Sequence, residues 1–295
     1  MVAPVEEFDG AGRSAASGSA PRGTLGAVVR SRERSASRRR PDRVAKETFS
    51  VGTTATMGQP APTRLAALRA DAAGIGRLVD ETIVLPRAGR TMVLVRPGDM
   101  DELLDRAVGD PEQNLPYWCE IWPSGVALAD AILTEPGHVA DGPVLELGSG
   151  LGITAAAALL AGADLVAADY APEALGLCRL NCLANAGREP ETLTLNWRRP
   201  GDDLFNLAGD GFPTVLAADV LYESRDVGPL LDLVGRLVAP GGLLWLAEPG
   251  RPPATRFLEA AREAGWHGET TRHPGPWPDP KDAGAVVGLH ALRRR

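Results

Sequence analysis

Short apolar runs alternate with stretches of helical periodicity from residue 143 to about residue 265. Apolar runs bounded by turn residues are typical of buried strands, whereas apolar residues three or four apart are typical of amphipathic helices. The alternation therefore predicts an α/β fold: an open, mostly parallel, doubly wound sheet with helices on both faces. The expected strands are 144–147, 164–168, 191–197, 214–219 and 243–248, and the expected helices are 153–162, 172–186, 227–238 and 253–264.

Two pairs of expected strands have no helix between them. The last pair, 266–272 and 284–292, is joined by the loop sequence HPGPWPDPKDAG. Parallel neighbours need a long crossover, so this pair should form an antiparallel hairpin at or near one edge of the sheet. A second hairpin is expected where 83–85 and 92–95 flank the sequence RAGR. Asp99 should cap the short helix MDELLDRAV that follows.

The chain divides into three expected regions. Residues 1–60 are rich in Ser, Ala, Gly and Arg, lack periodic apolar residues and contain the basic run RSRERSASRRR, which predicts a disordered tail. This tail is a basic arm for an acidic partner, a transit-like leader, or sequence upstream of a true start at Met57. Residues 61–114 are interpreted as an accessory hairpin and helix, a lid ahead of the main fold, and 115–295 as the main domain.

The strand at 144–147 leads into a loop with Gly148, Gly150 and Gly152 at alternate positions. A dinucleotide-binding loop has the spacing Gly-x-Gly-x-x-Gly, which points a helix N-terminus at a pyrophosphate. Here the third glycine comes one residue early. Glu146 also places a carboxylate at the strand end, which disfavours a pyrophosphate and suits a ligand with an ammonium group and a sulfonium. The loop is therefore predicted to bind a positively charged nucleotide cofactor.

Asp169 ends the next expected strand and lies 19 residues after Gly150. This is close to the spacing at which a carboxylate binds ribose hydroxyls. The alternative is that Asp169 caps the helix at 172–186.

Three aromatic residues, Tyr117, Trp118 and Trp122, precede the glycine loop. They either anchor this segment onto the domain or line the cofactor or substrate pocket. Ser124 is expected to be the N-cap of the helix that follows.

Composition narrows the function classes. Hydrophobic residues make up 44% of the 295, and no run of about 18 apolar residues predicts a membrane span. Cys119, Cys178 and Cys182 form no Cys-x-x-Cys pair, and the four histidines are scattered, so no metal site and no nucleophile–His–acid set is expected. The cysteine usage favours a reducing, cytoplasmic setting.

The charge is unevenly distributed. Residues 1–56 carry ten basic and six acidic residues, and the remainder carries 21 and 32, for a net charge of −7. An acidic folded part argues against nucleic acid as a partner and is compatible with a basic, lysine-bearing one, although solubility alone would also explain it. We expect no membrane partner and a monomer.

Several segments together resemble one family, the class I (seven-stranded) S-adenosylmethionine (SAM) methyltransferases, within their protein-lysine group with an Asp/Glu-x-x-Tyr signature. The resemblance covers about 115–250. It implies a Rossmann-like, seven-stranded sheet with one antiparallel strand, SAM as cofactor, and a protein substrate. The segments that carry it are IWPSGVALA, ELGSGLG, Asp169, LNW and ADVLYE.

The resemblance also implies a set of cofactor-binding residues. Glu146, Gly148 and Gly150 would hold the methionine part of SAM, Asp169 its ribose, and Trp197 would lie beside the adenine. Core packing is the alternative for Trp197. The full implied set is Trp122, Glu146, Gly148, Ser149, Gly150, Gly152, Asp169, Tyr170, Trp197 and Asp219.

Asp219 and Tyr222 fit the signature and would stand near the target nitrogen, as catalytic residues. Methyl transfer from a sulfonium is a direct displacement, in which positive charge moves to the acceptor nitrogen. The Asp219 carboxylate would stabilise that charge, and the Tyr222 hydroxyl could orient the nitrogen lone pair. The alternative for Asp219 is an N-cap or loop carboxylate.

The leading prediction is therefore SAM-dependent N-methylation of a protein lysine. A small-molecule N- or O-methyltransferase on the same fold is the first alternative, because the sheet does not specify the acceptor. A non-catalytic SAM-binding or scaffold protein is the second, and a nicotinamide-dependent oxidoreductase is more distant. Residues before 115 and the loop 272–283 are expected to choose the substrate.

Overall fold

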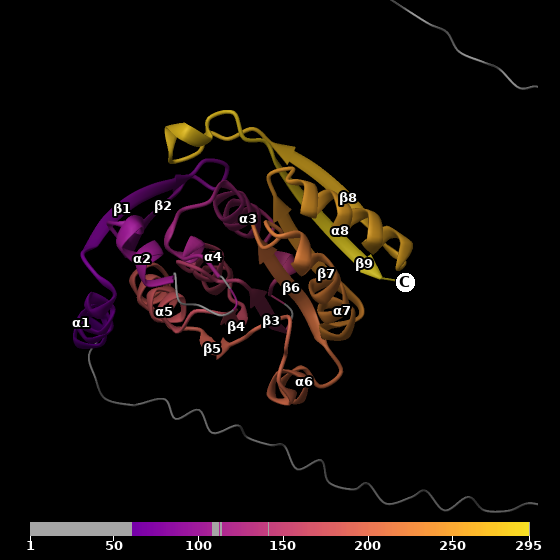
Figure 1. Cartoon of the computed structure of the whole chain (residues 1–295), viewed down its shortest axis with the longest axis horizontal. Coiled ribbons are helices and arrows are strands. Elements are labelled where there is room, and N and C mark those ends of the chain that lie inside the picture. The colour runs from indigo at the N-terminus through magenta and orange to yellow at the C-terminus, as the bar shows by residue number, and fades with distance from the viewer. Residues whose placement is uncertain (1–60, 108–111, 113, 141, 295) are drawn as a thin grey trace, which may run out of the picture. The chain divides into compact units, whose positions relative to one another are not determined.

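Seven strands form one sheet in the order β5-β4-β3-β6-β7-β9-β8 (Figure 1). Neighbours are parallel except at β9, which runs antiparallel to both β7 and β8. The predicted doubly wound sheet, mostly parallel with one antiparallel strand and an edge hairpin, is confirmed. The strands are β3 (Pro143–Leu147), β4 (Asp164–Asp169), β5 (Glu191–Thr194), β6 (Phe212–Ala218), β7 (Val238–Glu248), β8 (Trp266–His273) and β9 (Val287–Arg294).

This computed structural model describes residues 61–294 except 108–111, 113 and 141. The predicted basic tail, with Met57, lies outside the described residues. No helix in the described part is both long and apolar enough to cross a membrane.

Helices cover both faces of the sheet (Figure 1). Strand residues alternate between the two faces, so that Val144 packs in one core cluster and Leu145 and Leu147 in the other. The first cluster also contains residues of α3, α4 and α5, and the second contains residues of α6, α7 and α8. The helices are α3 (Pro123–Thr134), α4 (Ile153–Leu160), α5 (Pro172–Ala186), α6 (Asp202–Ala208), α7 (Val227–Leu237) and α8 (Pro252–Glu263).

A separate antiparallel hairpin, β1 (Leu78–Leu85) and β2 (Arg90–Pro97), packs on the α3–α5 face and follows α1 (Ala61–Ala72). Asp130 of α3 accepts hydrogen bonds from the backbone N–H groups of Arg87 and Ala88, which fixes the hairpin turn. The predicted hairpin is confirmed, with longer strands than expected. Asp99 caps α2 (Met100–Ala107) as predicted, by accepting from the Asp101 and Glu102 N–H groups.

Two asparagines of α5 supply the outer edge of β2 with hydrogen-bond partners. Asn181 accepts from Val95 N–H at 2.7 Å and donates to the Val95 carbonyl at 3.0 Å, and Asn185 makes the same pair of bonds with Val93. Asn181 also donates to the Leu151 carbonyl at 2.9 Å, so this fully buried amide joins the hairpin to the glycine loop. The side-chain amides take the place of a third strand.

Some elements differ from the sequence-based expectations. Helix α3 begins at Pro123 with Trp122 as its N-cap, and Ser124 is buried inside the first turn. The predicted N-cap at Ser124 is therefore wrong, because Pro123 already occupies the first helical position that favours it. Helix α6 was not expected, since its seven residues are too few for a clear period. Gly187 ends α5 in the left-handed conformation, as predicted.

Asn181→Ala should lower the free energy of unfolding by about 3 kcal/mol, because three buried backbone groups lose their partners. The matched variant Asn185→Ala, whose bonds are exposed to solvent, should lose less than about 1.5 kcal/mol. Urea unfolding measures both, and hydrogen exchange should show faster exchange of the Val95 amide in Asn181→Ala. Equal losses in the two variants would contradict the assignment of Asn181 as the buried joint.

Candidate functional site

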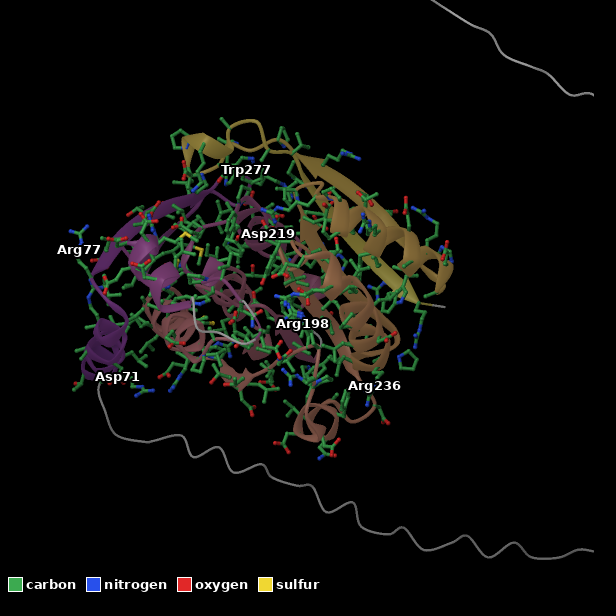
Figure 2. The ribbon with its side chains drawn as sticks, in the orientation of Figure 1. Asp71, Arg77, Arg198, Asp219, Arg236 and Trp277 are labelled. Atoms are coloured by element: carbon green, nitrogen blue, oxygen red, sulfur yellow. The ribbon has the colours of Figure 1, made fainter. Side chains whose placement is uncertain are left out.

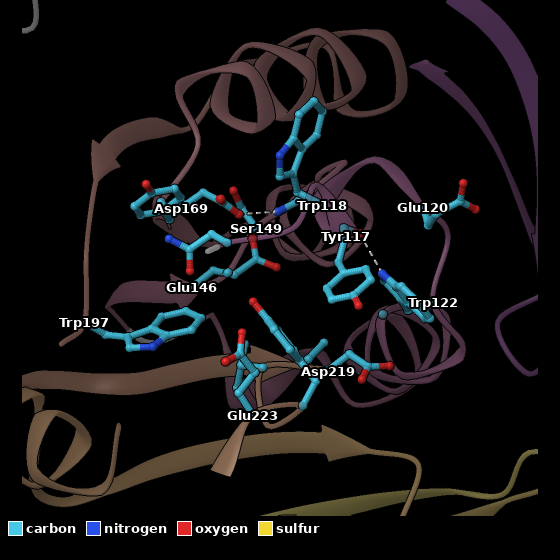
Figure 3. Close-up of a pocket in the computed structure, with 18 of the residues that line it drawn as sticks. Tyr117, Trp118, Glu120, Trp122, Glu146, Ser149, Asp169, Trp197, Asp219 and Glu223 are labelled. Carbon is cyan, nitrogen blue, oxygen red and sulfur yellow. Dashed lines mark hydrogen bonds between the residues drawn. The ribbon is translucent and has the colours of Figure 1, made fainter. Parts of the chain in front are cut away.

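A cavity of about 770 Å³ opens at the carboxyl ends of the parallel strands, where β3 and β6 are neighbours although their connections lead to opposite sides of the sheet. This is the topological switch point at which open α/β sheets bind ligands. Figure 3 shows Trp197 and Asp169 on one side of the cavity and Trp122 on the other, with Glu146 and Tyr117 between them. The cavity therefore has two ends with different side chains.

The loop after β3 has a backbone that only glycine fits well. Gly148 has φ +73, and a Cβ there would meet Val220 Cγ1 at 2.8 Å. Gly150 has φ +49, and its N–H donates to Asp169 Oδ2 at 2.8 Å. Asp169 Oδ1 accepts from Ala171 N–H at 3.0 Å, so one carboxylate ties the glycine loop to the start of α5. Burial raises the pKa of Asp169, and these backbone donors oppose the rise.

Glu146 is the most buried carboxyl at the cavity wall, with 1% of its surface exposed. Its Oε2 has no hydrogen-bond partner within the protein. Burial raises the pKa of Glu146 well above its ordinary value. A buried carboxyl with an unused oxygen facing a cavity is a site prepared for a donor that the protein itself does not supply.

The side of the cavity that carries Trp197 is held by a fully buried carboxylate, Asp226. Its Oδ1 accepts from Trp197 Nε1 at 3.0 Å, and its two oxygens receive a bidentate pair from Arg198, at 2.5 and 3.0 Å. Arg198, which is labelled in Figure 2, also donates to Glu112 and Asn114. This network fixes the Trp197 ring against the cavity and fastens the segment before Tyr117 to it.

Aromatic rings line the opposite end. Tyr117 makes edge contacts with Trp122 and Tyr222, with ring centroids 6.0 and 5.4 Å away. Trp122 Nε1 donates to the Tyr117 carbonyl at 2.8 Å. Burial raises the pKa of Tyr222, so its phenol stays protonated at neutral pH and its O–H can donate.

Asp219 lies between the two ends, directly after β6. Among the described residues, it is the only residue other than glycine with a positive φ, which is 58°. Side-chain-bearing residues rarely adopt this conformation, and those that do concentrate at functional sites. Asp219 Oδ2 accepts from the Ser124 hydroxyl at 3.0 Å, and Oδ1 pairs with the Arg251 guanidinium. The carboxylate is 8% exposed and faces the cavity.

The structure brings together all but one of the site residues predicted from the sequence. Gly152 does not line the cavity. A Cβ on Gly152 would meet Cys178 Cα and Sγ, each at 2.8 Å, so this glycine lets α4 begin against α5. The others line the cavity: Trp122, Glu146, Gly148, Ser149, Gly150, Asp169, Tyr170, Trp197, Asp219 and Tyr222. Their roles stay predictions.

The sequence analysis missed four residues that hold the site: Ser124, Arg198, Asp226 and Arg251. Asp226 and Arg251 follow β6 and β7, at the edge of the sheet where the site was expected. A single charged residue in a connecting segment forms no sequence pattern that would have indicated its role. No residue of the N-terminal hairpin lines the cavity, and the lid interpretation of this region stays a prediction.

No cysteine of the described residues lines the cavity. Cys178 and Cys182 are buried on α5 with their sulfurs 4.0 Å apart, and Cys119 is buried as well. In the part of the chain that the structure describes, no three His, Cys, Asp or Glu residues are grouped as metal ligands.

Gly152→Ala should lower the free energy of unfolding by about 2–4 kcal/mol, because the new methyl group overlaps the α5 backbone and the positive φ becomes strained. Gly176→Ala is the matched control on α5. No atom lies within 4 Å of its added Cβ, so it should stabilise the protein by about 0.5–1 kcal/mol. Urea unfolding of both proteins checks the prediction, and a neutral effect of Gly152→Ala would overturn the packing role.

Glu146→Gln should gain stability relative to the wild type as the pH rises. Since the folded protein holds the Glu146 proton more tightly than the unfolded chain, wild-type stability falls from about pH 4.5, the ordinary value, up to the raised pKa. The difference in free energy of unfolding between the Glu146→Gln variant and the wild type should grow by about 1.4 kcal/mol per pH unit within that window. Urea unfolding between pH 4 and 8 measures this difference, and a pH-independent difference would refute it.

Several known proteins are similar to part of this chain. The electron transfer flavoprotein beta subunit lysine methyltransferase of Rattus norvegicus is 34% identical over 139 residues, which are 46% of this chain and 52% of that protein. Histone-arginine methyltransferase METTL23 of Xenopus laevis is 29% identical over 144 residues, 48% of this chain and 61% of that protein. The N-methyltransferase NodS of Bradyrhizobium japonicum WM9 aligns with a TM-score of 0.47 at 15% identity, over 66% of this chain and 98% of that one.

The chain thus spans about half the length of the first of these curated relatives. The sequence profile of the lysine methyltransferase family matches residues 112–263, just over half of the 295. That segment includes the glycine loop, Asp169, the Trp197 network and the Asp219-x-x-Tyr222 signature. The chain therefore belongs to the lysine methyltransferase family.

Proposed function

We propose that this protein transfers a methyl group from SAM to a lysine side chain of a protein substrate. The observation that carries the proposal is the convergence, in one cavity, of Glu146, Asp169 and Trp197 with Asp219 and Tyr222. Family membership and the printed activity of the rat relative support it.

The residues present fit SAM. The unpartnered Oε2 of Glu146 suits the amino group of its methionine part, and the close backbone at Gly148 leaves room that a Cβ would fill. The Asp169 oxygens accept from the backbone N–H groups of Gly150 and Ala171, and a carboxylate has enough lone pairs to accept from ribose hydroxyls as well. The flat Trp197 ring, locked by Asp226, offers a surface for the adenine. When bound, SAM supplies an electrophilic methyl group on a positively charged sulfur.

The protein's contribution to the reaction is positioning and electrostatics. The acceptor nitrogen must lie in line with the carbon–sulfur bond, so orientation supplies much of the acceleration. The Asp219 carboxylate, fixed by Ser124 and by its strained backbone, faces the nitrogen on which positive charge develops. The neutral Tyr222 hydroxyl orients the nitrogen lone pair. The lysine must first lose a proton, which costs roughly 4 kcal/mol at neutral pH for an unperturbed amine.

Protein arginine methylation is the second candidate, favoured by the printed name of the Xenopus relative. The Arg251 guanidinium beside Asp219 also demonstrates that this carboxylate accepts such a group. The two candidates differ in the acceptor alone, so the same cofactor site serves both.

The test is incubation of the purified protein with methyl-labelled SAM and lysate, followed by acid hydrolysis and amino-acid analysis. Label in methyl-lysine supports the proposal, and label in methyl-arginine supports the second candidate. Label confined to small molecules, or no transfer despite SAM binding, would reject protein methylation. Purified electron transfer flavoprotein, the substrate named for the rat relative, is a further acceptor to include.

Asp169→Ala should weaken S-adenosylhomocysteine binding by roughly tenfold to a hundredfold, because charge-assisted hydrogen bonds to the ribose and the bond to Gly150 are lost. Asp219→Asn should leave that affinity within about twofold and lower kcat by roughly a hundredfold or more. Calorimetry and initial rates measure the two effects, and each variant is the control for the other. Unchanged affinity in Asp169→Ala would contradict the ribose assignment.

A further inference from the structure

Arg251 is a charged residue of the cavity that the proposed reaction does not use. Its guanidinium pairs with Asp219 and lies 5.4 Å from the centre of the Trp122 ring. A carboxylate and an aromatic face therefore hold Arg251 at the aromatic end of the cavity. In the proposed reaction, the acceptor lysine would have to approach this end.

The backbone of Arg251 is held in place by a buried glutamate. Glu248, at the end of β7, accepts from Gly250 N–H at 2.5 Å, and its other oxygen lies 3.0 Å from His290 Nε2 on β9. The Arg251 carbonyl accepts from Ala254 and Thr255 and so begins α8. Arg251 is thus fixed on rigid elements, not carried by a free loop.

The positive charge of Arg251 changes the electrostatic potential at the position that an incoming amine would occupy. Asp219 alone would stabilise a lysine ammonium and hold the proton that must leave before transfer. The charges of Arg251 and Asp219 together sum to about zero. Each Asp219 oxygen still has a lone pair that can accept from the nitrogen. The carboxylate can then orient the acceptor without strongly favouring its protonated form.

We propose that Arg251 is an electrostatic positioning residue that lowers the affinity of the acceptor site for a protonated amine and so favours the neutral, reactive lysine. This inference rests on the proposed function. Removing the charge at residue 251 should raise the apparent pKa of the bound acceptor by about one pH unit, which is about tenfold in rate at neutral pH.

Other charged and titratable groups around the cavity come from several elements and are unchanged in the test. They are Tyr117 and Glu120 before α3, Glu146 in β3, Asp169 at the end of β4, Arg198 after β5, Tyr222, Glu223, Arg225 and Asp226 after β6, and Asp282 in the β8–β9 loop.

The first measurement needs no turnover. Sinefungin is a SAM analogue with an amine-bearing carbon in place of the methylsulfonium, so it places a cationic amine at the transfer position, whereas S-adenosylhomocysteine places none. In Arg251→Gln, calorimetry at pH 7.5 should show the preference for sinefungin over S-adenosylhomocysteine increased about tenfold. Arg251→Lys keeps the charge and should retain the wild-type ratio. Arg256→Gln, an exposed arginine on the same helix, is the matched control.

The second measurement is the pH profile of initial label transfer to lysate protein at saturating SAM. The rise of the profile should shift upward by about one pH unit in Arg251→Gln, with the alkaline plateau kept, and should not shift in Arg251→Lys. A rate that falls equally at every pH overturns the inference and leaves a structural role. A lower KM with an unshifted profile overturns it too, since Arg251 would then only compete with the lysine.

The two measurements separate this inference from the proposed function. If the sinefungin preference rises as expected but no lysine takes label, the electrostatic role stands and lysine methylation fails. If both ligands bind and their ratio is the same in Arg251→Gln as in the wild type, the inference fails while the proposed function stands. If neither ligand binds the wild type, both are rejected.

Discussion

One hydrogen-bonded carboxylate holds together the two segments that form the glycine-loop side of the cavity. Asp169 accepts from the Gly150 N–H on one side and from the Ala171 N–H on the other. If the loop after β3 and the start of α5 separated, these buried polar groups would lose their hydrogen-bond partners. Two glycines make this close approach possible. Gly148 and Gly150 adopt a left-handed backbone that brings the loop close to Val220 and Trp118. The shape of the cavity follows from these contacts.

Away from Asp169, three other buried acidic side chains hold connecting segments in place. Asp226 fixes Trp197 and Arg198, Asp130 fixes the hairpin turn, and Glu248 fixes the loop that leads to Arg251. Each carboxylate accepts from backbone or side-chain donors that would be unsatisfied without it. Buried polar side chains therefore set the positions of loops that hydrophobic packing alone would leave free.

Much of the fold and most of the candidate site were predictable because they follow local rules. The alternation of apolar runs predicts the sheet, and the ends of β3, β4 and β6 place Glu146, Asp169 and Asp219 at one edge. The remaining features depend on contacts across the chain. Nothing near Ser124 in the sequence indicates that it donates to Asp219, 95 residues away, and nothing near Asn181 indicates its bonds to Val95. Gly152 fits the glycine pattern but serves helix packing.

The bonds between α5 and the hairpin bear on where this protein can be divided. A fragment that began at residue 115 would match the family profile almost in full, yet it would strip Asn181, Asn185 and Asp130 of the backbone groups that they hold. It would also expose the apolar surface of α3 and α5 that the hairpin covers. The main domain and its N-terminal strands therefore share one apolar core and one set of buried hydrogen bonds, and a cut at the boundary suggested by family resemblance would divide both.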